Sequence, residues 1–149
     1  MALKEQINAE MKAALLGGDR FVGETLRNLK AAILNEEVAR NQREEGLGDE
    51  DVEKVIAREV KKRTESAKLY RENDRPELAE PEEQEMEVLK RFLPQQIGED
   101  ELRSLVAKKI ATLGVSGPQA IGRVIGALKQ ELGNTVDGVM LARIVKEQL

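Results

Sequence analysis

The side chains able to do chemistry in this 149-residue chain are carboxylates, amines, guanidinium groups and hydroxyls, because it contains neither histidine nor cysteine. That composition excludes a Cys/His zinc site, a thiol nucleophile and a histidine general base. The three serines, Ser66, Ser104 and Ser116, do not lie in the Gly/Ser-rich loops that amidases of the Ser–Ser–Lys type need. A Walker loop and a dinucleotide-binding glycine fingerprint are also missing. We therefore expect no catalytic residue, no metal and no cofactor.

An acidic cluster is the one candidate for a cation site, since carboxylate oxygens bind divalent metals. Only Glu83 and Glu87 within it share a helix face at i,i+4 spacing. We favour the alternative that these carboxylates stabilise the positive end of a helix dipole near Pro81. The cluster comprises Glu80, Glu82, Glu83, Glu85 and Glu87.

The densest basic stretch is Lys61-Lys62-Arg63, which could face phosphates together with Lys54 and Arg58. Glutamates interleave with it, and Glu50–Lys54 and Lys61–Glu65 have the spacing of ordinary i,i+4 ion pairs. We interpret the stretch as a solvated helix face. Arg58, Lys61 and Lys62 remain a second choice for a phosphate contact.

Gly122 and Gly126 are four residues apart, so they lie on one face of a predicted helix. A glycine inside a helix costs about 1 kcal/mol relative to alanine, which implies that something approaches the backbone closely. We favour a neighbouring helix of the same domain; the alternative is an RNA backbone or a partner protein. The candidate contact residues are Gly122, Arg123, Gly126, Lys129, Asp137, Gly138 and Arg143.

We predict that all of these candidate residues lie on or beside helices. Charged residues make up 35% of the chain and aromatic residues 2%, and the apolar residues recur at helical rather than alternating spacing. We predict an all-α fold with seven helices. They cover residues 3–16, 20–43, 49–72, 81–93, 99–113, 117–132 and 138–149.

Two caps and one capping box are predicted from residue type. Asp19 and Asp137 each precede a helix and can accept hydrogen bonds from its first N–H groups. Ser116 and Gln119 have the spacing of a capping box.

A change in composition near Pro94 predicts two domains. Residues 1–94 hold 17 basic and 22 acidic side chains, whereas residues 95–149 hold 7 and 6. We predict an N-terminal bundle of long antiparallel helices over 1–94 and a compact three-helix domain over 95–149. We expect no membrane span, because no apolar run is long enough, and a cytoplasmic location, because disulfides are impossible.

Several segments along nearly the whole chain resemble one family in order and spacing. That family is the YqeY-like proteins, stand-alone relatives of the tail domain of the B subunit of the glutamine-dependent aspartyl/glutamyl-tRNA amidotransferase. The segments are Met11-Lys-Ala-Ala14, Thr25–Glu37, Glu59–Ser66, Glu87–Gln96, Ile121-Gly-Arg-Val-Ile-Gly126 and Val136-Asp-Gly138.

The resemblance implies an all-helical fold in two parts and a connection to tRNA, which the amidotransferase tail holds while other domains do the chemistry. The family is labelled as carbon–nitrogen ligases with glutamine as amide donor. We interpret that label as inherited from the complex, since this chain has nothing to activate ammonia or a carboxylate.

Two functions remain open from the sequence. The first is a non-catalytic accessory module that contacts tRNA, alongside amidotransferase subunits, through Arg123, Lys129, Arg143 and Lys146. The second is a helical protein–protein adaptor without nucleic-acid binding. It is motivated by the acidic N-terminal part and by the single Lys129 between Gly126 and Asp137.

Overall fold

The computed structural model describes residues 1–149, and every regular element in it is helical. The predicted all-α class and the number of α-helices are confirmed. The chain divides into two compact units, Met1–Leu93 (unit 1) and Pro94–Leu149 (unit 2).

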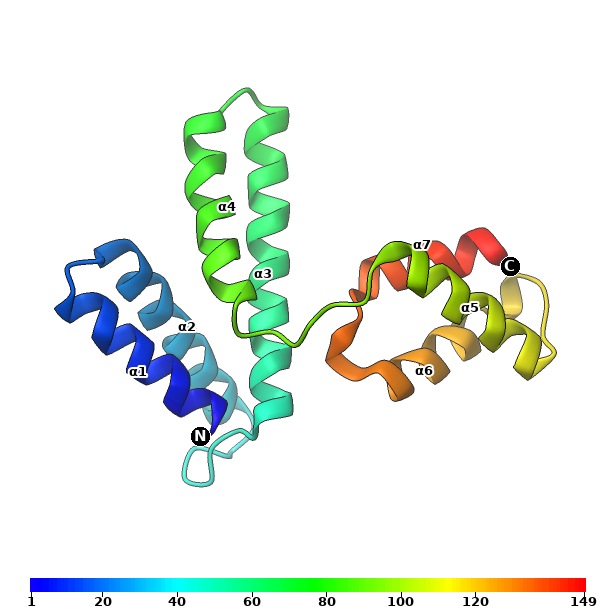
Figure 1. Ribbon diagram of the computed structural model, residues 1–149, viewed down its shortest axis with the longest axis horizontal. Helices are drawn as coiled ribbons and strands as arrows, with labels where there is room; N and C mark the ends of the chain where they lie inside the picture. Colours follow the sequence, from blue (N-terminus) through cyan, green and yellow to red (C-terminus); the bar gives the residue numbers. More distant parts are fainter. The chain divides into compact units, whose positions relative to one another are not determined.

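Unit 1 is built from two helical hairpins (Figure 1). α1 (Leu3–Leu16) and α2 (Arg20–Ala39) form one, and α3 (Asp49–Glu72) and α4 (Pro76–Lys90) form the other. The turn of the first hairpin ends at Asp19, whose carboxylate accepts the N–H of Val22 at 3.2 Å, so the predicted cap is confirmed.

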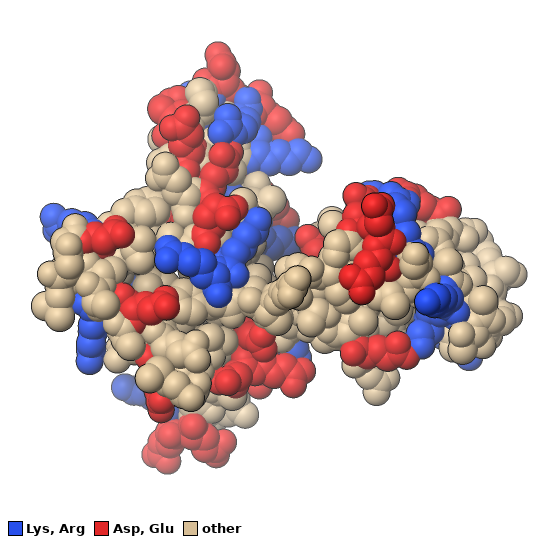
Figure 2. Space-filling view, viewed as in Figure 1, with Lys and Arg blue, Asp and Glu red and all other residues tan.

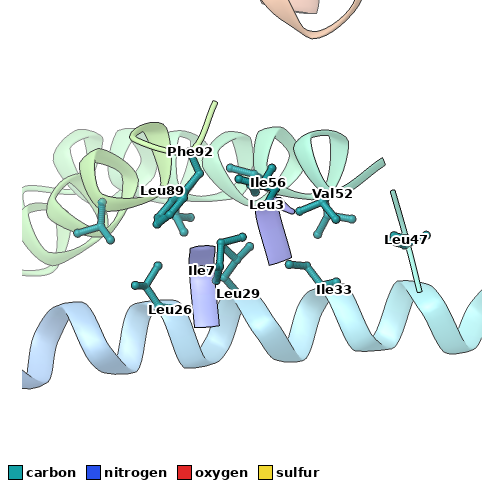
Figure 3. Packing of buried hydrophobic residues seen from close by; sticks show 12 residues of the cluster. Leu3, Ile7, Leu26, Leu29, Ile33, Leu47, Val52, Ile56, Leu89 and Phe92 are labelled. Atoms are coloured by element: carbon teal, nitrogen blue, oxygen red, sulfur yellow. The ribbon is translucent and has the colours of Figure 1, made fainter. Parts of the chain in front are cut away.

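Aliphatic side chains from all four helices meet in the core of unit 1 (Figure 3). The stripes that form it recur every three or four residues, which is why each helix buries one face and leaves the other to its charged residues. The core consists of Leu3, Ile7, Leu26, Leu29, Ile33, Leu47, Val52, Val55, Ile56, Val88, Leu89 and Phe92.

Three predicted helix boundaries in unit 1 are wrong, and one of them is the end of α4, which lies at Lys90 rather than Leu93. α2 ends at Ala39 rather than Arg43, because Asn41 adopts a left-handed backbone conformation (φ 55°) that stops the helix. α4 begins five residues earlier than predicted, with Pro76 in its first turn and Pro81 inside the helix. Pro76 satisfies the same preference for proline at a helix start that we had assigned to Pro81.

Unit 2 contains α5 (Glu99–Leu113), α6 (Ile121–Leu132) and α7 (Gly138–Gln148), with single 3₁₀ turns at Pro118–Ala120 and Gly133–Thr135. Its core gathers residues from all three helices: Leu102, Val106, Val124, Leu128, Leu141, Ile144 and Val145.

The predicted capping box before α6 is wrong. Ser116 makes no capping hydrogen bond, and a 3₁₀ turn that follows Gly117 separates it from the helix. Gly117 has φ 83°, a conformation that favours glycine, and the Gln119 side chain folds over it instead of reaching back to Ser116.

Candidate contact surface on the C-terminal unit

α6 has a buried side and a glycine side. Val124 and Leu128 are fully buried, whereas Gly122 and Gly126 are exposed. At 100° per residue, Gly122, Gly126 and Lys129 fall on one stripe, turned away from the buried side chains. A Cβ added at either glycine would meet no atom within 4 Å.

This geometry overturns the interpretation that we favoured from the sequence. No neighbouring helix packs on Gly122 or Gly126, so the fold itself does not require small residues there. The two glycines lower the stability of α6, and no close packing of a neighbouring helix compensates for this. The alternative, that this face meets an RNA backbone or a partner protein, stays a prediction.

Two of the predicted cations border this face and are unpaired. Arg123 and Lys129 are exposed and make neither an ion pair nor a hydrogen bond. The amine end of Lys129 lies 3.9 Å from where a Cβ of Gly138 would be, so Lys129 reaches the start of α7. We call Gly122, Arg123, Gly126, Lys129 and Gly138 the glycine surface.

Asp137 caps the N-terminus of α7, as predicted. Its Oδ1 accepts the N–H of Val139 at 2.8 Å and that of Met140 at 3.3 Å. This carboxylate therefore satisfies two of the N–H groups that a helix start leaves unpaired. The cap fixes the position of Gly138 beside Lys129.

Arg143 belongs to a ring of alternating charges rather than to the glycine surface. It contacts Glu99 at 2.6 Å and Glu147 at 3.3 Å, and Arg103 contacts the same two carboxylates at 2.9 and 2.8 Å. The hydrogen bond from Glu99 raises the pKa of Arg143, and the bond from Arg143 lowers the pKa of Glu99. Arg143 is thus already engaged within unit 2.

Sequence reasoning missed this ring, although both halves of it were visible. Glu99–Arg103 and Arg143–Glu147 are i,i+4 pairs. Sequence spacing could not show that packing of α7 on α5 joins the two pairs. Lys108 was also missed; like Lys146, it is exposed and has no ion pair.

The basic stretch of α3 is mostly ion-paired. Arg58 contacts Glu36 at 3.2 Å, and Lys62 contacts Glu59 at 3.0 Å. The predicted Glu50–Lys54 pair is confirmed at 3.9 Å, whereas Lys61 and Glu65 do not pair. Figure 2 shows basic and acidic side chains interleaved on α3 and α4. Of our second-choice residues, only Lys61 is unpaired.

The acidic cluster of α4 has a different cause from the one that we assigned. Because α4 begins at Pro76, these glutamates lie beyond its first turn, where the dipole has little effect. Glu83 instead contacts Arg71 at 2.5 Å, and Glu85 contacts Arg63 at 2.9 Å. No group of three acidic side chains is arranged to hold a metal ion.

None of the seven α-helices has the length and apolar character needed to cross a bilayer. Helical hairpins in unit 1 and three helices in unit 2, one of them with two exposed glycines, define the chain as a small all-helical protein.

Comparison with known sequences assigns the family. The model of the family described as Yqey-like protein matches residues 4–149, and the chain belongs to that family. It is also similar to the altered inheritance of mitochondria protein 41, mitochondrial, of Clavispora lusitaniae (strain ATCC 42720). The two are 27% identical over 92 residues, which is 62% of this chain and 52% of that protein. The chain thus spans about half the length of that relative.

Proposed function

We propose that the chain is a non-catalytic accessory module that contacts tRNA, resembling the tail of the amidotransferase B subunit and working alongside amidotransferase subunits. The observation that carries the proposal is the glycine surface. Gly122 and Gly126 leave the α6 backbone open to a close contact, and Arg123 and Lys129 are free to meet phosphates beside it.

Salt dependence of tRNA binding tests the proposal. We expect affinity to fall steeply with salt, because phosphate contacts release counterions. Replacing Arg123 and Lys129 by alanine should weaken binding and reduce the salt slope by about one unit for each lost contact.

The matched control replaces two unpaired, exposed cations of unit 1, Lys12→Ala with Arg27→Ala. The control should leave binding near that of the unmodified chain. Equal losses in the two double variants would contradict a specific role for the glycine surface.

A second candidate, the helical adaptor, is favoured by how few cations are free. Of the seven basic side chains in unit 2, Arg103, Lys109 and Arg143 are ion-paired. An adaptor would use the glycine surface to dock a protein partner. It would show no tRNA binding at any salt concentration.

In either role we propose that the chain alone does not turn over glutamine. Incubation of the purified protein with glutamine, ATP and a mischarged tRNA should release no glutamate above background. Release that persists through further purification would contradict this.

A cytoplasmic location stays a prediction; the name of the relative gives mitochondria for that protein.

We also propose that the two units are separate domains, an N-terminal bundle of antiparallel helices over 1–94 and a three-helix domain over 95–149. Each unit has its own hydrophobic core, which supports the proposal. Fragments 1–94 and 95–149 should each unfold cooperatively when heated. A fragment that shows no thermal transition would contradict it.

A further inference from the structure

The part of the α3/α4 hairpin nearest its turn lies away from α1 and α2 (Figure 1). No hydrophobic residue of α3 after Val60, or of α4 before Val88, belongs to the core of unit 1 or packs against it. Ala67 and Ala79 are the buried hydrophobic residues of this part. Any helix that covers its outer faces must therefore come from outside unit 1.

One face of this part has an open depression of about 560 Å³, which we call the α3 depression. Contacts across the hairpin fix which residues share the face. The Thr64 hydroxyl lies 2.8 Å from the Met86 sulfur, and Arg71 contacts Glu83 at 2.5 Å. Ala67 is buried and forms part of the floor. The lining residues are Thr64, Ala67, Lys68, Arg71, Glu72, Glu83 and Met86.

A second open depression, of about 360 Å³, adjoins the first along α4, because Glu83 and Met86 line both. We call it the α4 depression. Glu80 in its lining makes no ion pair and no hydrogen bond, and Glu87 has only a contact of 3.6 Å with Lys90. The lining residues are Glu80, Glu83, Gln84, Met86 and Glu87.

The lining residues have the spacing that receives the side chains of a packed helix. In knobs-into-holes packing, a side chain of one helix inserts among four residues of the facing helix at i, i+3, i+4 and i+7. On α3 this set is Thr64, Ala67, Lys68 and Arg71. On α4 it is Glu80, Glu83, Gln84 and Glu87. The hairpin thus has two adjacent holes of this kind, and both are hollow.

The two depressions differ in chemistry. Ala67, Met86 and the aliphatic stem of Lys68 give the α3 depression an apolar lining. Two cations and four carboxylates line the two depressions together, and each cation already contacts a carboxylate of the set, Lys68–Glu72 at 3.9 Å and Arg71–Glu83. The carboxylates are Glu72, Glu80, Glu83 and Glu87. The excess of negative charge lies on α4.

We propose that the two depressions, together the hairpin groove, dock one α-helix of a partner protein. That helix places an apolar side chain in the α3 depression and a lysine or arginine in the α4 depression. The i, i+3, i+4, i+7 lining selects a helix, and Glu80 and Glu87 select its charge. The same carboxylates disfavour a nucleic acid. The groove lies on unit 1 and is independent of the tRNA contact proposed for unit 2.

The test titrates the full chain, with isotope-labelled methionine methyl groups, with a fluorescent peptide of about three heptads. The peptide carries leucines at positions a and d and lysines at e and g. One control peptide has glutamates in place of the lysines, and another has the same composition in scrambled order. We expect only the lysine heptad peptide to bind and to shift the Met86 methyl signal. Met11 and Met140, which pack against the two cores, should keep their signals.

Variants then assign the contact. Glu80→Lys with Glu87→Lys should raise the Kd of the lysine peptide by about tenfold or more, because like charges then meet, and should favour the glutamate peptide. The matched control, Glu44→Lys with Glu65→Lys, changes the net charge equally at two exposed, unpaired glutamates of unit 1 and should leave the Kd unchanged. Thermal unfolding of each variant verifies that the fold is retained.

The apolar requirement is tested on the peptide itself. Serine in place of the leucines at position d should raise the Kd by about tenfold or more, because the α3 depression then receives no apolar side chain. An unchanged Kd would contradict the role given to this depression.

Four other outcomes would overturn the proposal: absence of binding, equal binding of the scrambled peptide, an unshifted Met86 signal at saturation, or an equal loss in the Glu44 and Glu65 control. Self-association of the chain that Glu80→Lys with Glu87→Lys abolishes would also overturn it, because the occupant would then be a second copy. None of these results bears on tRNA binding, so the two proposals fail separately.

Discussion

Nζ of Lys4 at the start of α1 lies 2.5 Å from Oε2 of Glu37 near the end of α2, and the same oxygen accepts the N–H of Leu47 at 2.8 Å. The Glu37 side chain is 4% exposed. One buried carboxylate therefore joins two helices and the loop that leads to α3. Gly46 completes the arrangement, since a Cβ there would lie 3.1 Å from Lys4 Nζ and 3.2 Å from Glu37 Oε2.

We predict that Glu37→Ala lowers the free energy of unfolding by about 1–3 kcal/mol, because the buried N–H of Leu47 loses its acceptor. Glu37→Gln should cost less, since an amide oxygen can still accept from Leu47. Urea titration monitored by circular dichroism measures both. The control is Glu44→Gln, an exposed glutamate of the same loop without an ion pair. An equal effect of the control would contradict the assignment to this contact.

We predict that unit 1 loses stability in acid. Burial raises the pKa of the Glu37 carboxyl, but the bonds from Lys4 and Leu47 outweigh it, and the net pKa lies below the ordinary value of 4.5. The same balance, with Lys62 and Arg63, lowers the pKa of Glu59. A carboxyl whose folded pKa is lowered stabilises the fold above the unfolded pKa, and that contribution disappears as pH falls through the folded pKa.

The measurement is the free energy of unfolding of fragment 1–94 between about pH 7 and about pH 3. The free energy of unfolding should be constant in the upper part of this pH range. It should decrease once the pH is below the ordinary glutamate pKa. Glu82 acts in the opposite direction, because its pKa is raised. A Glu37→Gln chain should show a shallower fall; an identical fall would contradict the role given to Glu37.

We predict that Gly122→Ala with Gly126→Ala stabilises unit 2 while weakening ligand binding. Both positions have helical backbone and open space for a Cβ, so each alanine should add up to about 1 kcal/mol. The added methyl groups would at the same time keep a ligand backbone away from α6. Thermal unfolding and tRNA or partner binding are measured on the same variant. Unchanged binding would show that nothing approaches α6 closely at these residues.

We predict that Asp137→Ala costs about 1 kcal/mol of stability through loss of the α7 cap. Asp137→Asn should cost much less, because an amide oxygen can accept from Val139 and Met140 in the same geometry. Chemical unfolding of fragment 95–149 compares the three chains. If Asp137→Ala and Asp137→Asn lose the same free energy of unfolding, the charge of Asp137 rather than its capping hydrogen bonds would be responsible.

Local rules predicted the helices well where one residue type dominated a boundary. Gly114 ends α5 in a left-handed conformation (φ 63°), and both ends of α5 were predicted to the residue. The start of α4 was misplaced because Pro76 and Pro81 both suit a first turn, and only packing against α3 decides between them. Sequence spacing also placed Gly122 and Gly126 on one face. It could not say whether another helix covers that face, since this depends on how α5 and α7 pack on α6.

The ring formed by Glu99, Arg103, Arg143 and Glu147 also affects how fast a ligand arrives. Its charges sum to zero and alternate, so its field decays within a short distance in physiological salt. Arg103 and Arg143 therefore contribute little to the long-range attraction of a polyanion to unit 2. The encounter rate of a polyanion with unit 2 would then depend on the unpaired cations Lys108, Arg123, Lys129 and Lys146, opposed by Asp100, Glu101 and Asp137, which belong to no ion pair.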